Sequence, residues 1–240
     1  MKNFCVSVAA CAVFLSFAIP SARARDLPVC GPTVAVGASC LLAAGAVRPT
    51  QMAFGEIEVA RRASAIAAMD AAALDNYLRK HVMPVVIGPG RAFYATDRHH
   101  LAIAVGRANG RESPVIATVV DDWHTLEPAV FWKRMLVAGR AYPFDETGAG
   151  PFAFALMPAS VFDLRDDPLR SLANGLQNAG GYADNSGVPY ADFLWAEFLR
   201  PRVSAALIAS DFGAAVAAAK VLACSPAAVQ LPGASGASCR

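Results

Sequence analysis

The residues best suited to chemistry lie together in the segment Thr96-Asp97-Arg98-His99-His100. The chain has four histidines, and two are adjacent here, between a predicted strand over 92–96 and a predicted helix over about 99–108. Backbone N–H groups at a helix N-terminus attract anions, and Arg98 adds positive charge. Asp97 is a candidate to orient a histidine, act as a general base or hold a metal. Alternatively, Asp97 only caps the helix and the histidines lie at the surface.

The two adjacent histidines are not expected to face one ligand. Neighbouring residues of a helix point about 100° apart. We therefore expect one of His99 and His100 to be catalytic and the other structural.

A second candidate is Asp121-Asp122-Trp123-His124, directly after an apolar strand predicted over 115–120. Two carboxylates and a histidine are suitable ligands for a metal ion. The alternative is a turn with solvated acids, which its composition favours. If this strand lies beside the one that ends at Thr96, the two candidate sites merge.

A third candidate is the charged run 163–171, which contains Arg170. Alternating charges are typical of a solvated, salt-bridged helix start. In a functional interpretation, Arg170 would bind a phosphate group through two N–H bonds.

Composition and the absence of known motifs argue against several classes of protein. The 240 residues are 55% hydrophobic and 17% charged, which supports one domain or two small ones and argues against disorder. The formal charge of +2 argues against a general nucleic-acid coat. The sequence contains no P-loop, G-x-S-x-G, H-E-x-x-H or dinucleotide fingerprint.

The N-terminus has the order of features of a cleavable signal peptide over 1–24. Lys2 precedes an apolar run over 4–19, and Pro20 is followed by the small-x-small site Ala22-Arg23-Ala24. We expect an exported protein, periplasmic or secreted from a bacterium, with no membrane span after cleavage. Loss of Lys2 and Arg23 leaves 19 basic against 19 acidic residues.

Four cysteines remain after that cleavage: Cys30, Cys40, Cys224 and Cys239. An even set in an oxidising compartment favours structural disulfides over zinc or redox chemistry. Three pairings are open, and Cys30–Cys40 with Cys224–Cys239 is the local one.

The segments that must position these residues alternate between helix and strand patterns. Residues 25–46 read as an irregular leader and 225–240 as a loop tail. Two short strands over 83–87 and 92–96 flank a Gly-Pro-Gly turn and predict a hairpin. The second half is mostly helical, and its aromatic residues follow helical stripes that indicate core packing: Phe131, Trp132, Phe193, Trp195 and Phe198. The fold class is α+β, a small sheet with surrounding helices and a helical C-terminal half.

Several of these segments together resemble a known family. They are Val47-Arg48-Pro49-Thr50-Gln51, the helix over 56–69 after Gly55, the strand 84–88, the motif 93–101, and the later segments 166–172 and 193–196. The chain resembles the ParB/sulfiredoxin-like fold and, within it, the ParB-like nucleases. The resemblance implies a ParB-like core over 47–125 and a helical extension over 126–224.

In that superfamily the strand-to-helix junction binds nucleotide or other phosphate groups. Asp97 and His100 match its usual Asp and His, whereas Arg98 replaces a glycine and Leu101 replaces an arginine. The resemblance implies a phosphoester hydrolase, nominally a nuclease, in which Asp97 and His100 supply base and acid or ligate a metal. Arg98 or Arg170 would hold the phosphate.

Glu56, at the start of its helix, would add a carboxylate to this site. The implied partners are a phosphate-containing ligand or nucleic acid. No cofactor is identified beyond a divalent metal ion, and the oligomeric state is left open. The missing arginine motivates an alternative, a non-catalytic periplasmic domain that binds phosphate or nucleotide on the same scaffold.

Overall fold

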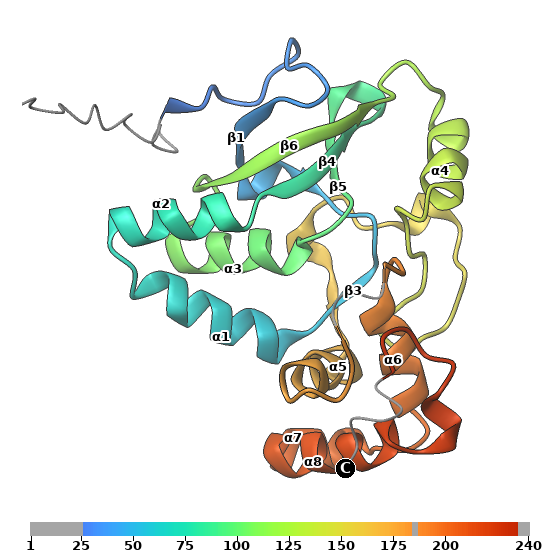
Figure 1. Ribbon diagram of the computed structural model, residues 1–240. Coiled ribbons are helices and arrows are strands. Elements are labelled where there is room, and N and C mark those ends of the chain that lie inside the picture. The colour runs from blue at the N-terminus through green and yellow to red at the C-terminus, as the bar shows by residue number, and fades with distance from the viewer. Residues whose placement is uncertain (1–25, 184–186, 235–240) are drawn as a thin grey trace, which may run out of the picture.

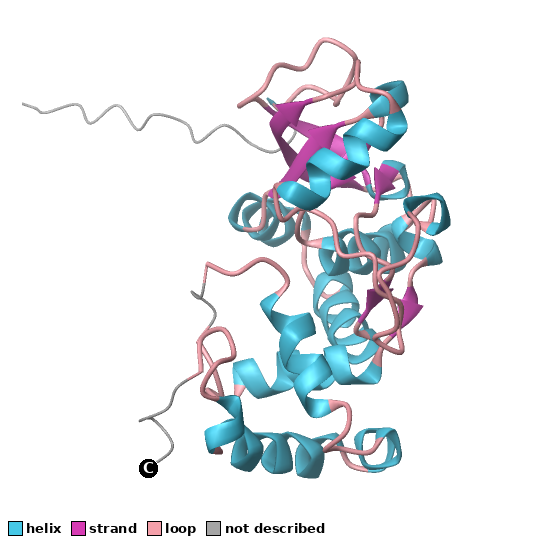
Figure 2. Ribbon diagram, turned by 90° about the vertical axis from the view of Figure 1, so that its right-hand side faces the viewer, coloured by secondary structure: helices cyan, strands magenta, loops and turns pink. Residues whose placement is uncertain are grey.

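The computed structural model describes residues 26–183 and 187–234 (Figure 1). A small sheet and the helices against it form one half of the molecule, and a group of helices forms the other (Figure 2). The predicted signal peptide over 1–24 lies outside the described residues. No described helix has both the length and the apolar character needed to cross a membrane.

The main sheet has five strands in the order β1-β6-β4-β5-β2. Their bounds are Ser39–Ala43 for β1, Val47–Arg48 for β2, Met83–Ile87 for β4, Phe93–Ala95 for β5 and Pro114–Asp122 for β6. The predicted hairpin is present as antiparallel β4 and β5. β4 and β6 run parallel at the centre, and β5 pairs with β2 in parallel.

The sequence predicted an irregular leader over 25–46, and this prediction was wrong for the second half of the segment. β1 is an edge strand that pairs antiparallel with β6, Cys40 opposite Ala117. The disulfide Cys30–Cys40 attaches the preceding loop to this strand, so the local pairing of these two cysteines is confirmed. Cys224 is not a free thiol either, and its proposed partner Cys239 lies outside the described residues.

Three helices cover one face of the sheet: α1 (Glu56–Ala67), α2 (Ala71–Lys80) and α3 (His99–Asn109) (Figure 1). Asp70 begins α2, because its carboxylate accepts hydrogen bonds from the N–H groups of Ala72 and Ala73. α3 lies between α1 and the sheet and is buried from His99 to Gly106. Such deep burial gives the first turn of α3 a fixed position at the end of β5.

Helix α4 (Pro128–Val137) starts with the proline that favours a first helical turn. Its Phe131 and Met135 are buried with Trp123 and with Val86 of β4 in a second cluster. After α4 a long loop returns toward the middle of the molecule. There β3 (Ala53–Phe54) pairs in parallel with β7 (Arg165–Asp166) and links the two halves.

The second half consists of α5 (Pro168–Asn178), α6 (Ala191–Leu199), α7 (Ala205–Ser210) and α8 (Phe212–Ala223) around their own apolar core. The predicted start of α5 is confirmed, since the Asp167 carboxylate accepts the N–H of Leu169. Trp195 is fully buried, as its stripe predicted, and its indole N–H donates to the carbonyl of Pro232. The predicted loop tail contains a single 3-10 turn over Pro226–Ala228 among its described residues.

Candidate functional site

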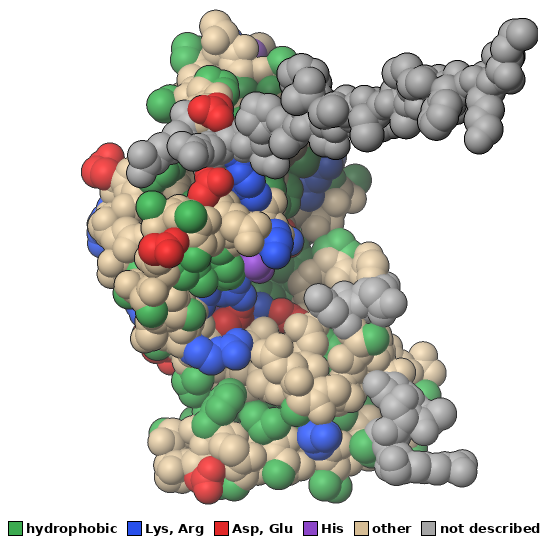
Figure 3. Space-filling view, turned by 60° about the vertical axis from the view of Figure 1, so that its left-hand side comes forward, with side chains coloured by type: hydrophobic (Ala, Val, Ile, Leu, Met, Phe, Trp, Pro, Cys, Tyr) green, Lys and Arg blue, Asp and Glu red, His purple; other side chains and the backbone are tan. Residues whose placement is uncertain are grey.

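A cavity of about 440 Å³ opens between the two halves of the molecule. Figure 3 shows it as a hollow in which histidine, basic and acidic side chains meet. Its lining combines the end of β5 and the start of α3 with residues of α5, the loop after α4 and the start of α6: Gln51, Thr96, Asp97, Arg98, His99, His100, Ala138, Gly139, Arg140, Arg170, Gln177, Gly187, Val188, Pro189, Tyr190, Ala191, Asp192 and Phe193. The predicted segment 96–100 and the distant Arg170 therefore share one cavity.

The N-terminus of α3 has no side-chain cap. Arg98 is the N-cap residue and has a left-handed backbone, with φ of 63°. The exposed Asp97 accepts the N–H of Arg98 at 2.6 Å instead of capping the helix. The alternative in which Asp97 serves as the helix cap is therefore wrong. An uncapped helix N-terminus that lines a cavity is a favourable position for an anion.

His99 and His100 are both buried, so the alternative that placed them at the surface is also wrong. The Nε2 atom of His99 accepts the N–H of Thr50 at 3.1 Å, and that of His100 accepts the N–H of Gly55 at 2.8 Å. A ring nitrogen that accepts cannot carry the proton, which therefore sits on Nδ1 of each neutral ring.

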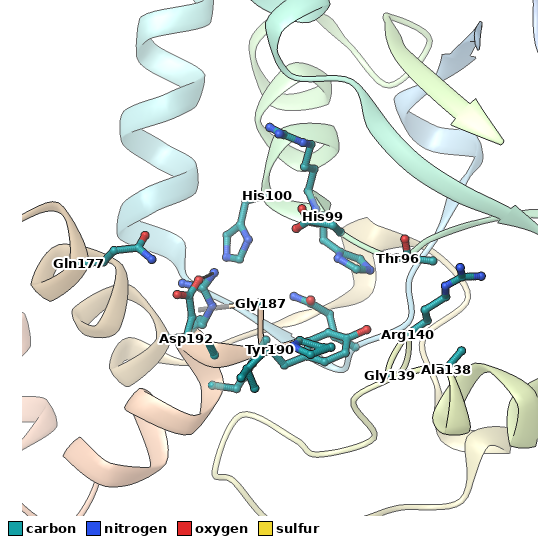
Figure 4. A pocket seen from close by; sticks show the side chains of 18 residues that line it. Thr96, His99, His100, Ala138, Gly139, Arg140, Gln177, Gly187, Tyr190 and Asp192 are labelled. Carbon is teal, nitrogen blue, oxygen red and sulfur yellow. Dashed lines mark hydrogen bonds and ion pairs between the residues drawn. The ribbon is translucent and has the colours of Figure 1, made fainter. Parts of the chain in front are cut away.

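Burial, aided by the neighbouring His100 and Arg170, lowers the pKa of His99 to about 3. Burial likewise lowers the pKa of His100 to about 4, against the opposing effect of Glu58. Both rings are therefore neutral at pH 7, and both hold the segment 50–55 against α3. Figure 4 shows the His100 ring turned toward the side of the cavity where Asp192 lies.

Glu58 is the carboxylate that sequence reasoning missed. It is 6% exposed, and its Oε2 lies 3.7 Å from His100 Nε2 and 3.5 Å from a guanidinium nitrogen of Arg170. Its Oε1 accepts a bond of 3.0 Å from Arg62, four residues along α1. That spacing of an acid and a base was the available sequence signal.

Burial alone would raise the pKa of Glu58, but the cationic partners lower it to about 2. His100 is the largest of the lowering influences, followed by Arg170 and Arg62. Since His100 is neutral at pH 7, the two arginines are the cations that hold Glu58 ionised there.

Arg170 crosses from the helical half into the cavity wall. It is 7% exposed and pairs with Asp192 at 2.5 Å as well as with Glu58. Its Nε atom is buried and has no hydrogen-bond partner among the described residues. A buried N–H donor without an acceptor is costly, and among the described arginines with such an atom only Arg170 lines the cavity.

Glu56, the predicted carboxylate, does not line the cavity. It forms a two-bond ion pair with Arg107 on α3, with N–O distances of 2.5 and 2.9 Å. The side chain of Glu56 therefore helps to hold α1 against α3.

The candidate metal ligands Asp121, Asp122 and His124 contact different partners. Asp121 pairs with Arg140, which lines the cavity. Asp122 contacts His124 Nδ1 at 2.6 Å, and His124 Nε2 lies 3.0 Å from Arg91. Within 26–183 and 187–234, no group of three His, Cys, Asp or Glu side chains is arranged to hold a metal. We therefore assign no metal-ligand set.

Tyr190 joins the two halves beside the cavity. Its hydroxyl lies 3.3 Å from Oγ1 of Thr50, and that oxygen donates its own proton to the carbonyl of Ala95 at 2.7 Å. Tyr190 is therefore the donor to Thr50. Burial raises the pKa of Tyr190, so the phenol keeps its proton.

The fold is a five-stranded mixed sheet, and an uncapped helix starts after β5 at the cavity between the two halves of the molecule. These features define a ParB-like α+β domain with a helical extension. The family model described as "Putative ParB-like nuclease" matches residues 40–201, and the chain belongs to this family. The start of the match at residue 40 agrees with β1 as part of the core.

The chain is also similar to a solved structure, the crystal structure of protein Atu1540 from Agrobacterium tumefaciens. The two share 35% identity and a TM-score of 0.73, over 82% of this chain and 97% of that one. No curated protein matches the sequence.

Proposed function

We propose that this ParB-like protein hydrolyses a phosphoester at the cavity over the N-terminus of α3. The observation that carries the proposal is that Asp97, His100 and Arg170 line one cavity although Arg170 lies far from the other two in sequence. The buried, unpartnered Nε of Arg170 supplies a specific donor for an anionic oxygen. Membership of the nuclease-like family supports this class of reaction.

Asp97 is the base in this proposal. It is exposed at the cavity, and one of its oxygens already accepts the N–H of Arg98, which fixes the carboxylate. The other oxygen is then oriented to take a proton from the water that attacks phosphorus. The N–H groups of the first turn of α3 and the guanidinium of Arg170 would stabilise the charge on the phosphoryl oxygens.

His100 has a different proposed role from the acid that the resemblance implied. With its pKa at about 4, it is neutral at pH 7 and its Nε2 is occupied by Gly55. Its Nδ1–H donates a hydrogen bond to a phosphoryl oxygen, while the leaving oxygen takes its proton from solvent. The neutral ring also keeps Gly55 in place beneath the cavity.

The experiment is a turnover screen with the purified protein against nucleic acids, nucleotides and phosphodiesters, with and without divalent metal ions. Asp97→Asn should abolish any turnover while circular dichroism and the melting temperature stay unchanged. The matched control is Asp163→Asn, which alters an exposed carboxylate outside this cavity and should leave the rate unchanged. Turnover that survives in Asp97→Asn would exclude Asp97 as the base.

A second candidate is binding without catalysis. The charged groups of the cavity wall are largely paired already, Arg170 with Glu58 and Asp192, and Arg140 with Asp121. Such pairing suits a preformed binding site. Thermal stabilisation of the protein by a phosphate ligand, without turnover under any metal condition, would favour this candidate over hydrolysis.

We also propose that the protein is exported. The signal-like order of residues 1–24 supports this, and so does the Cys30–Cys40 disulfide, since such bonds persist in oxidising compartments. Mass spectrometry of the protein from a periplasmic extract should give a chain that begins at Arg25. An intact Met1 in the cytoplasmic fraction would contradict export.

A further inference from the structure

A second cavity, of about 500 Å³, has walls that differ from those of the cavity over α3. Among the described residues, the two linings share no side chain, and the proposed function uses none of the second. Its walls come from three parts of the chain: residue 52 before β3, the loop over 145–152 and the segment 156–165, which ends in β7. The volume lies in the range of pockets that enclose a small organic molecule.

Hydrogen bonds fix the walls of this second cavity. The Oδ1 atom of Asp145 accepts the N–H groups of Thr147 and Ala149, at 2.8 and 3.0 Å, together with the hydroxyl of Thr147. On the opposite segment, Arg48 of β2 donates to the carbonyl of Ala159 at 2.8 Å. The cavity is therefore preformed, which lowers the cost of ordering it around a ligand.

The charged groups of the second cavity are mostly acidic. Asp145, Glu146 and Asp163 face a single cation, Arg165, so the formal charge of the lining is −2. Arg165 contacts Glu146 at 3.2 Å, but its side chain is 76% exposed, and exposed pairs of this kind contribute little. The Arg165 side chain is therefore free to give way to another cation.

Two of these carboxylates still have oxygens to offer. The three hydrogen bonds to Asp145 all reach Oδ1, so its Oδ2 is available. Within the described part of the chain, the carboxylate of Asp163 has no hydrogen-bond or ion-pair partner. A ligand with positive charge at two points would satisfy both side chains.

The remaining lining of the second cavity is apolar. It consists of Met52, Phe152, Leu156, Pro158 and Ala159. Leu156 is 61% exposed, so a ligand that covers it removes apolar surface from water, which favours binding. An apolar wall beside an excess of carboxylates is complementary to an organic cation with a hydrocarbon body, and it disfavours an anion.

We propose that the second cavity binds a small aliphatic diamine. Its hydrocarbon chain lies on the apolar wall, and its two ammonium groups donate to the carboxylates of Asp145 and Asp163. Two positive ends balance the formal charge of −2, and ammonium–carboxylate hydrogen bonds are among the stronger ones in proteins. The inference is independent of the proposed phosphate site, because it uses other residues.

Calorimetric titration of the purified protein with 1,5-diaminopentane, pentylamine and 1,5-pentanediol tests the inference. An ion pair at an exposed carboxylate corresponds to an affinity gain of up to about 5-fold. The diamine should therefore bind about 2- to 5-fold more tightly than pentylamine, which has one ammonium group. The diol has the same chain without charge and should bind most weakly of the three.

Two variants with opposite expected effects locate the site. Asp163→Asn removes an anion and should weaken diamine binding about 2- to 5-fold, whereas Arg165→Gln removes the competing cation and should strengthen it by a similar factor. Both side chains are exposed, so both variants should fold. The control is Asp97→Asn, which removes an exposed carboxylate from the other cavity and should leave diamine affinity unchanged.

Each contrary result has a separate meaning. The absence of saturable heat with the diamine up to about 10 mM would overturn the proposal. Equal affinities for the diamine and pentylamine would overturn the second ammonium contact, and equal affinities for the diamine and the diol would overturn the role of charge. Unchanged or weaker binding in Arg165→Gln would overturn the assignment to this cavity, even if Asp163→Asn does not fold. The phosphate site is tested separately by the turnover screen.

Discussion

Acidification should destabilise this protein well above the pH at which carboxylates titrate, because of His99 and His100. Their folded-state pKa values are lowered to about 3 and about 4, from an ordinary 6.5. Below pH 6.5 the unfolded chain binds protons that the folded chain does not, so stability falls with pH. The loss extends down to about pH 4 for His100 and to about pH 3 for His99.

The magnitude follows from the same values. At pH 5 each ring lies about 1.5 pH units below its unfolded pKa and above its folded one, which amounts to about 2 kcal/mol per histidine. The two together give about 4 kcal/mol between pH 7.5 and pH 5, a large share of the stability of an ordinary domain. Solvent screening does not reduce this figure much, because the two residues are only 2% and 6% exposed.

Urea unfolding at pH 7.5 and pH 5 measures this loss. In His99→Gln and His100→Gln an amide oxygen still accepts the N–H of Thr50 or Gly55 but does not titrate, so each variant should lose about half of the pH dependence. His81→Gln, at the C-cap of α2, is the matched histidine control with which the two variants are compared. Asp166 and Asp167, whose pKa values are raised by burial, act in the opposite sense, so the variants are compared with the wild type.

The reasoning is refuted if the free energy of unfolding does not change between the two pH values. It is refuted equally if both glutamine variants lose as much free energy of unfolding between pH 7.5 and pH 5 as the wild type does. Either result would show that the imidazoles are protonated in the folded protein and that the Nε2 acceptors are misassigned.

Three further outcomes follow from the packing and the charges. Gly55→Ala should destabilise the fold by about 1–3 kcal/mol in urea unfolding, because a Cβ there would lie 2.7 Å from Ser171 Oγ and 2.9 Å from Ser171 N. Gly213→Ala is the control and should not destabilise the fold, because its added Cβ would meet only Asp211, at 3.4 Å. Equal stability of the two variants would contradict the close approach of Gly55 to Ser171. Glu58→Gln should cost about 3–5 kcal/mol, since it leaves the buried guanidinium of Arg170 and the partly buried one of Arg62 short of a counter-charge. A loss no larger than that of the exposed Glu112→Gln would count against this ion-pair network. Binding of a short single-stranded oligonucleotide should weaken only about 3-fold between 50 and 200 mM salt, as one phosphate contact implies. A loss above 100-fold in a filter-binding assay would show many contacts instead.

The sequence was informative where the signals are local. The hairpin of β4 and β5, the start of α5 at Asp167-Pro168 and the helix after Asp97 all depend on neighbouring residues, and the structure contains them. β1 was missed because Ser39–Ala43 is a short apolar run among glycines and prolines, which has no clear period. Its strand character comes from pairing with β6, which is distant in the chain.

The site was predictable only in part, for the same reason. The sequence identified the segment 96–100 as a helix start and singled out Arg170, and the structure shows that both line the cavity. Glu56 was named and Glu58 was not, because spacing along α1 does not show that Glu58 is the residue that faces His100. Thr50 and Tyr190 are 140 residues apart and meet only through packing of the two halves. Nothing in the local sequence of either one indicates that contact.

If the proposed phosphate site exists, its specificity would come from directed hydrogen bonds rather than from net charge. The positive charge of Arg170 and Arg62 is balanced by Glu58 and Asp192, and that of Arg140 by Asp121. Balanced pairs have weak long-range fields, so they do not attract a polyanion from a distance. In the proposed site, a bound anion would instead gain the unpartnered Nε of Arg170 and the N–H groups at the start of α3, which lacks a side-chain cap. We therefore expect the proposed site to distinguish ligands by shape and by donor position, and to bind a small phosphate ester in preference to a long nucleic acid held by charge.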